Sequence, residues 1–192
     1  MNLNFREIYT KSNYLSLFRL LMVIPLFFLM DNLANEYVYR VYVLLMILLA
    51  FFTDIADGWL ARKYNEITEF GKIIDPLADK VFVAVLVFKL YLLNEIPGYY
   101  FWIIVIRDIV IFLGGIYVAN IIGKILPSNL LGKITVFSIG LFLISVVLDI
   151  KEVITWLYNF LFYGSITLSF ASVAGYAIRA IENVKWKRNE AV

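Results

Sequence analysis

Four aspartates lie between residues 53 and 80, although the chain on both sides of this stretch is almost continuously apolar. Asp54 and Asp57 are three residues apart, so a helix places both side chains on one face. Asp75 and Asp79 are four apart and share a face of the following helix. A short reversal between antiparallel helices puts the two pairs at similar depth. Converging carboxylates repel one another at low dielectric, so we predict that divalent cations bind between them.

Small residues accompany these carboxylates. Gly58 and Ala61 extend the first face, and Gly71 extends the second, which leaves room for a ligand to lie against the helix backbone. Two metal ions bridged by shared carboxylates suit phosphoryl chemistry, because they stabilise the attacking and leaving oxygens of an in-line displacement.

The chain contains no cysteine and no histidine. Disulfides, thiolate zinc sites and a cysteine nucleophile are therefore excluded, and so are the commonest general base and transition-metal ligand. A metal site in this chain must be built from carboxylates, which favours hard divalent cations. The net charge of +2 does not suggest a nucleic-acid partner.

The composition is that of an integral membrane protein, with 62% hydrophobic residues and a mean hydropathy of +0.84. Soluble domains are about 45–50% apolar. No strand-length run alternates with a period of two, so we predict an all-α bundle in a single domain, 1–192. A spanning helix needs about 20 apolar residues, and six such helices are predicted. They cover residues 14–31, with a kink at Pro25, and 38–61, 73–93, 99–122, 131–148 and 153–180.

The distribution of basic residues predicts the orientation in the membrane. One side collects Arg6, Lys11, Arg19, Arg62, Lys63, Lys72, Lys124, Lys133, Lys185, Lys187 and Arg188, and the other collects Arg40, Lys89 and Lys151. Both termini and the loop near residue 65 are therefore expected to face the cytoplasm. The first dozen residues mix aromatic and charged side chains, which predicts a short interfacial helix at the N-terminus.

The stretch "DIADGWLARKYNEITEFGKIIDPLAD" fits the pattern D-x-x-D-G-x-x-A-R, a spacer, then G-x-x-x-D-x-x-x-D. All eight positions match: Asp54, Asp57, Gly58, Ala61, Arg62, Gly71, Asp75 and Asp79. The chain thus resembles the CDP-alcohol phosphatidyltransferases. The resemblance implies six transmembrane helices, a homodimer, and an enzyme that takes a CDP-linked lipid and an alcohol and releases CMP.

The resemblance also implies roles for these residues. Asp54, Asp57, Asp75 and Asp79 would hold two ions of Mg²⁺ or Mn²⁺, and Asp79 would also be the general base for the acceptor hydroxyl. The nucleotide side would comprise Asn13, Asp57, Gly58, Ala61, Arg62 and Gly71. The expected location is a bacterial cytoplasmic membrane, with the active site on the cytoplasmic side.

The acceptor alcohol is predicted from weaker patterns. "SNYLSLFR", residues 12–19, resembles the "PN-x-L-T-x-x-R" start of the branch that uses glycerol 3-phosphate, with Ser16 in place of threonine. Arg107 and Asp108, followed by Gly114 and Gly115, look at least as much like the cardiolipin synthase branch. "LPSNLLGKIT", residues 126–135, resembles both branches.

We expect CDP-diacylglycerol as donor and glycerol 3-phosphate as acceptor, with phosphatidylglycerol as the alternative, and inositol phosphate or serine as further ones. A phosphate pocket for an anionic acceptor is predicted from Arg107, Lys133 and Arg179, since arginine suits bidentate phosphate contact. Alternatively, Lys133 and Arg179 only extend to the interface, and Arg107 only pairs with an acid.

Two other classes of protein remain open at this point. Acidic residues in membrane helices also mark cation transporters. The four aspartates cluster at one side, however, and Glu95, Asp149 and Glu152 lie in or beside the opposite loops. A non-catalytic scaffold would not need the eight motif positions.

Overall fold

The computed structural model describes residues 10–64, 71–123 and 129–190, and its regular elements in these ranges are all α-helices. They are α1 (Lys11–Met30), α2 (Tyr37–Tyr64), α3 (Gly71–Leu92), α4 (Gly98–Ile122), α5 (Leu130–Val147), α6 (Ile150–Val153) and α7 (Thr155–Glu190). The chain divides into two compact units, Met1–Glu95 and Ile96–Val192.

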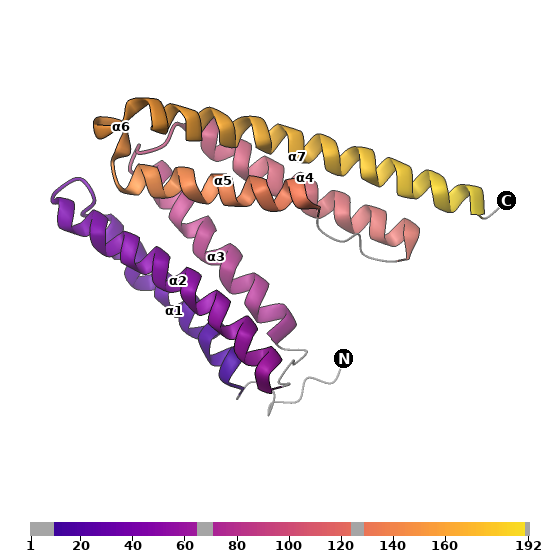
Figure 1. Ribbon diagram of the computed structural model, residues 1–192, viewed down its shortest axis with the longest axis horizontal. Helices are drawn as coiled ribbons and strands as arrows, with labels where there is room; N and C mark the ends of the chain where they lie inside the picture. Colours follow the sequence, from indigo (N-terminus) through magenta and orange to yellow (C-terminus); the bar gives the residue numbers. More distant parts are fainter. Residues whose placement is uncertain (1–9, 65–70, 124–128, 191–192) are drawn as a thin grey trace. The chain divides into compact units, whose positions relative to one another are not determined.

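In the first unit, α1 packs against both α2 and α3 (Figure 1). The hydroxyl oxygen of Thr10 caps α1 by accepting a hydrogen bond from the backbone amide of Asn13. One stripe of α1 is buried along its whole length. Its first part is polar (Asn13, Ser16 and Arg19) and its second part is apolar (Met22, Leu26 and Met30).

At the other end of this unit, two ion pairs connect the helices. Lys89 of α3 lies 2.5 Å from Asp31, which follows α1, and its ammonium lies over the ring of Phe27 at 3.7 Å. Arg40 of α2 lies 2.9 Å from Glu95, beyond the end of α3. Both cationic side chains are buried. These two ion pairs therefore hold together the neighbouring ends of α1, α2 and α3.

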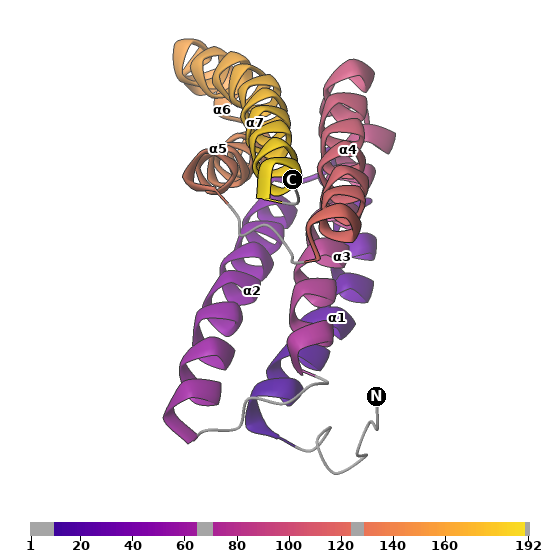
Figure 2. The same cartoon turned by 90° about the vertical axis from the view of Figure 1, so that its right-hand side faces the viewer.

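In the second unit, α7 packs against both α4 and α5 (Figure 2). Three hydrogen bonds join α4 to α7: Tyr100 with Ser165, Arg107 with Ser172, and the Lys187 ammonium with the carbonyl of Ile121. The partners are 65 or 66 residues apart in all three cases, so α4 and α7 run parallel in constant register. An aromatic cluster of Tyr100, Phe142 and Phe162 fills the core, with centroids 4.6–5.3 Å apart.

The all-α prediction is confirmed for the described residues. Within them, five helices are long and apolar enough to cross a membrane: α1, α2, α4, α5 and α7. The predicted span 73–93 forms α3, but its charged residues, among them Asp75, Asp79 and Lys89, leave it outside this group. Six spans are therefore not confirmed.

Two details differ from the sequence-based expectation, and a third prediction is not tested. Residues 149–152, "DIKE", lie between the last two predicted spans, but Ile150–Val153 form the single helical turn α6, which follows Asp149 with φ 56°. The last helix continues past residue 180 to Glu190. The interfacial helix was expected in the first dozen residues, of which 1–9 lie outside the described residues, and from Lys11 onward the chain already belongs to α1.

Candidate active site

Two side chains of α1 bring the four aspartates together. The hydroxyl of Ser16 lies 2.5 Å from Oδ1 of Asp75 on α3 and 3.2 Å from Oδ2 of Asp57 on α2. The hydroxyl carries one proton, which the shorter distance assigns to Asp75. Ser16 is fully buried, so this contact between the two aspartate pairs is shielded from water.

Arg19, one turn further along α1, contacts three of the carboxylates. Its Nη2 atom lies 2.5 Å from Oδ2 of Asp57, and its Nη1 atom lies 3.5 Å from Oδ1 of Asp54 and donates a hydrogen bond to Asp79. The side chains of Arg19 and Asp57 are almost completely buried, at 2% and 4% exposed, whereas Asp54 and Asp79 are 48% and 44% exposed. The cluster therefore has a buried side and an open side.

The charge of the cluster favours cations. Three of the four carboxylates pair with the guanidinium of Arg19 and the fourth contacts Ser16, and the oxygen donors suit Mg²⁺ or Mn²⁺. As the side chains lie, however, no group of three or more acidic side chains in the described ranges is arranged to hold an ion. The guanidinium of Arg19 lies among these carboxylates. The donor set fits a divalent cation in chemistry and charge, and the predicted two-ion geometry is not confirmed.

The expected nucleotide side lies partly within the described structure. Asn13 is buried on α1, Gly58 is half-buried on α2, and Gly71 is buried at the first position of α3. Ala61 and Arg62 belong to α2, but their side chains lie outside the description. The predicted contact with a nucleotide stays a prediction for these five residues and Asp57.

The three residues expected to bind the acceptor all lie in the second unit, and each has a different setting. Arg107 on α4 is buried, donates from Nε to the Ser172 hydroxyl at 3.2 Å, and pairs with Asp108 at 2.6 Å. Lys133 on α5 is exposed, and Arg179 on α7 is partly buried.

Arg107 and Lys133 lie at a similar height along α7. Leu131 of α5 approaches Gly175, and the Thr135 hydroxyl bonds the carbonyl of Leu168, so Lys133 lies level with the turn around Ser172 that Arg107 contacts. Arg179 lies seven residues beyond Ser172, about 10 Å along the helix axis. The structure therefore does not show the three cations as one pocket.

Sequence reasoning did not identify Ser16 and Arg19 as site residues. Arg19 lies within an apolar run and was counted only as a basic residue near a helix end. Its spacing of three from Ser16 and six from Asn13 repeats on one helix face. That spacing is the feature of the sequence from which the polar stripe could have been inferred.

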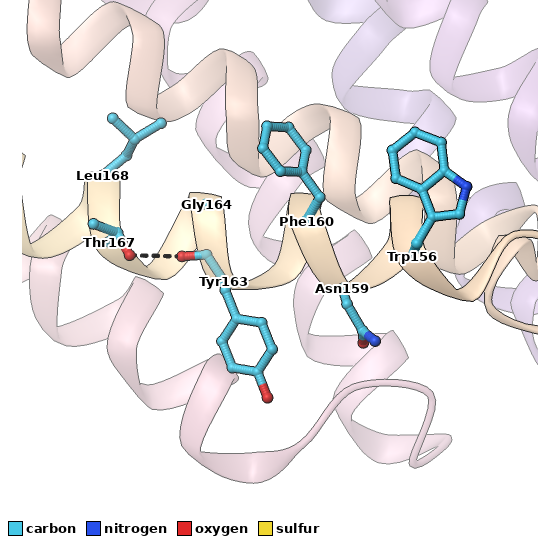
Figure 3. Close-up of a pocket in the computed structure, with 7 residues that line it drawn as sticks. All are labelled: Trp156, Asn159, Phe160, Tyr163, Gly164, Thr167 and Leu168. Atoms are coloured by element: carbon cyan, nitrogen blue, oxygen red, sulfur yellow. Dashed lines mark hydrogen bonds between the residues drawn. The ribbon is translucent and has the colours of Figure 1, made fainter.

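A shallow hollow lies along α7, away from charged side chains (Figure 3). Its lining is largely aromatic and apolar, with Trp156, Phe160, Tyr163 and Leu168 beside Asn159, Gly164 and Thr167. The Thr167 hydroxyl bonds the carbonyl of Tyr163 in its own helix. Since no carboxylate or cation lines the hollow, it offers no group for phosphoryl transfer.

Comparison with known proteins gives consistent results. The sequence model of the family described as CDP-alcohol phosphatidyltransferase matches residues 9–171, a range that contains the four aspartates, Arg107 and Lys133. A protein of Aquifex aeolicus named CDP-diacylglycerol–glycerol-3-phosphate 3-phosphatidyltransferase is 33% identical over 180 residues, which is 90% of this chain and 96% of that protein. A Rickettsia typhi protein of the same name is 42% identical over 88 residues, which is 44% of this chain and 48% of that protein. A Mycobacterium tuberculosis protein described as a probable phosphatidylglycerophosphate synthase is 32% identical over 139 residues, which is 69% of this chain and 65% of that protein.

Proposed function

Because the chain belongs to the CDP-alcohol phosphatidyltransferase family, we propose that it transfers a phosphatidyl group from CDP-diacylglycerol to glycerol 3-phosphate and releases CMP. The observation that carries this proposal is the convergence of the four motif aspartates on Ser16 and Arg19 of a neighbouring helix. The spacing of the aspartates in sequence is thereby matched by contacts in space.

Asp54, Asp57, Asp75 and Asp79 would hold the divalent cations, Mg²⁺ or Mn²⁺. When bound, these ions would offset the charge of the diphosphate and make CMP a better leaving group. Asp79 accepts the proton of the acceptor hydroxyl, a role supported by its position on the open side of the cluster. The acceptor oxygen then bonds to the lipid-side phosphorus, and the bond from that phosphorus to the CMP oxygen breaks.

Glycerol 3-phosphate is the favoured acceptor because several relatives are named for it, including one aligned over almost its whole length. Arg107, Lys133 and Arg179 are proposed to bind the acceptor phosphate. Arg107 supports this role best, since its guanidinium is buried and already held by Ser172 and Asp108. Phosphatidylglycerol is the second candidate acceptor. The reason is the Arg107–Asp108 pair, which resembles the cardiolipin synthase branch.

The family assignment places the chain among membrane enzymes, and five long apolar helices agree with this. We propose that α3 is a sixth span, because 22 residues of helix extend about 33 Å, close to the thickness of the hydrocarbon layer. The charges of α3 are compatible with this position, since Asp75 and Asp79 are partnered by residues of α1 and Lys89 by Asp31, which directly follows α1. We further propose that both units form one catalytic domain, that the protein is a homodimer, and that the aspartates and both termini face the cytoplasm of a bacterium.

A cation transporter would need acidic groups that continue across the membrane. Asp31 and Glu95, at the other end of the first unit, are instead paired with Lys89 and Arg40. This pairing favours an enzyme with its aspartates at one side.

The test is release of CMP by the purified protein in detergent. CDP-diacylglycerol with Mg²⁺ or Mn²⁺ should yield CMP with glycerol 3-phosphate, and less or none with phosphatidylglycerol, inositol phosphate or serine. EDTA should abolish the release, and added Mn²⁺ should restore it.

Asp79→Asn should abolish turnover, while circular dichroism should show that the protein remains folded. Absence of CMP with every acceptor would contradict the enzyme assignment, and an active Asp79→Asn protein would contradict the general-base role.

A further inference from the structure

Arg19 shares its partners with the proposed metal ions. Its guanidinium forms ion pairs with Asp54 and Asp57 of α2 and with Asp79 of α3. A divalent cation that binds these carboxylates competes with Arg19 for their negative charge, and it repels a guanidinium a few ångströms away. The binding of Arg19 and the binding of divalent cations to these carboxylates therefore weaken each other.

The partners of Arg19 differ in how open they are. Asp57 is buried together with Arg19, and its Oδ2 atom lies 2.5 Å from Nη2 of the guanidinium. Asp54 and Asp79 are about half exposed, and Asp54 is the more distant partner at 3.5 Å. An ion arriving from water reaches these two carboxylates first.

The guanidinium itself is not fully satisfied. Its Nε atom is buried without a hydrogen-bond partner in the described part of the structure. Buried polar atoms in native proteins are usually paired, because an unpaired donor costs about 1–3 kcal/mol. The unpaired Nε atom therefore lowers the cost of moving the guanidinium away from the carboxylates.

We propose that Arg19 is a built-in counter-cation, which holds the aspartates together when no divalent ion is bound and releases Asp54 and Asp79 when ions bind. This inference rests on the proposed metal site. Loss of the charge then has two opposite effects. The metal-free protein loses stability, because the carboxylates repel one another with no positive charge among them. The affinity for metal rises, because a competing cation has been removed.

The experiment compares Arg19→Gln and Arg19→Lys with the control Arg40→Gln. The control removes a buried arginine from an ion pair at the other end of the same unit. Melting temperatures are measured in EDTA and with saturating MnCl₂, and Mn²⁺ binding is measured by electron paramagnetic resonance.

Arg19→Gln should melt at a lower temperature than Arg40→Gln in EDTA and recover most of this loss in Mn²⁺. It should also bind Mn²⁺ about fivefold more tightly than the wild type, which is at the lower end of typical coupling between sites. Arg40→Gln should melt lower by the same amount in both conditions, with unchanged Mn²⁺ affinity.

A second variant covers the case in which Arg19→Gln does not fold. In the double variant Arg19→Gln, Asp79→Asn one repelling charge is removed, so it should melt higher in EDTA than Arg19→Gln or yield folded protein where the single variant does not. Arg19→Lys should lie between wild type and Arg19→Gln in both measurements.

The outcomes separate this inference from the proposed function. A wild type that binds Mn²⁺ and releases CMP, together with an Arg19→Gln protein that binds Mn²⁺ equally or more weakly, overturns the counter-cation role alone. A wild type that neither binds Mn²⁺ nor releases CMP overturns the proposed function. In that case the melting temperatures in EDTA decide whether Arg19 holds the carboxylates together. A decrease for Arg19→Gln that is no larger than the decrease for Arg40→Gln overturns the counter-cation role.

Discussion

Ser16 and Arg19 show how much of this site depends on residues that do not belong to the aspartate motif. Both are almost completely buried on α1, and between them they contact carboxylates of α2 and of α3. The aspartates are the proposed metal ligands, and a hydroxyl and a guanidinium contact both pairs. The site therefore needs three helices, and α1 contributes no acidic residue to it.

Arg107 gives a prediction about the acceptor. Arg107→Gln should raise the KM for glycerol 3-phosphate by about tenfold or more, since a charge-assisted hydrogen bond contributes about 1.5–3 kcal/mol. The KM for CDP-diacylglycerol should stay unchanged. Steady-state CMP release at varied concentrations of each substrate provides both values.

Two neighbouring variants serve as controls for Arg107. Ser172→Ala removes the hydroxyl that accepts from Nε, and Asp108→Asn removes the ion-pair partner, but both keep the guanidinium charge. Both should change the KM for glycerol 3-phosphate less than Arg107→Gln does. Equal rises in both KM values for Arg107→Gln would show a structural role instead.

At the scale of helices, the two ends of the first unit are built differently. Near Ser16 and Arg19, one guanidinium faces several carboxylates. The far end has two ion pairs, each of one acidic and one basic side chain. They are Asp31 with Lys89 and Glu95 with Arg40. The far end is balanced in charge, so it holds the helices without attracting ions.

In the pair of Asp31 and Lys89, we predict that replacing the acid lowers stability more than replacing the base. Lys89 is buried, whereas the Asp31 side chain is 51% exposed. Asp31→Asn leaves a buried ammonium without its carboxylate and should lower stability by about 1–3 kcal/mol, because unpaired buried charge is costly. Lys89→Met leaves only a half-exposed carboxylate and keeps the apolar stem, so it should cost less. Thermal unfolding in detergent measures both, and a larger loss for Lys89→Met would contradict the explanation.

At the scale of the whole molecule, the basic residues expected on the non-cytoplasmic side are largely neutralised. Of Arg40, Lys89 and Lys151, the first two form ion pairs. The proposed orientation therefore rests on the sequence count of eleven basic residues on one side against three on the other.

The absence of cysteine makes the orientation simple to test, because no native thiol has to be removed. Asn35→Cys, in the connection between α1 and α2, should react with a membrane-impermeant maleimide in intact cells. Lys63→Cys, near the end of α2 and on the expected cytoplasmic side, should react only after permeabilisation. Both native side chains are exposed in the structure. The reverse labelling pattern would contradict the proposed orientation.

The helix positions followed from the sequence because long apolar runs and their polar breaks mark them directly. The pairing of Asp54 with Asp57 and of Asp75 with Asp79 followed from helical periodicity. The contacts of Arg19 did not follow, because a single arginine in an apolar run gives no information about its partner in space. The turn α6 was missed because "DIKE" is polar, and the extension of α7 was missed because charge was read as the end of a helix.

The stripe on α1, polar from Asn13 to Arg19 and apolar from Met22 onward, restricts how this helix can move. Sliding α1 by one turn, about 5.4 Å, would carry Met22 to the carboxylates or Arg19 into the apolar part of the stripe. Rotating it by one residue, about 100°, would withdraw the polar and apolar contacts at the same time. Any rearrangement of the aspartates that keeps these contacts therefore has to leave α1 in register with α2 and α3.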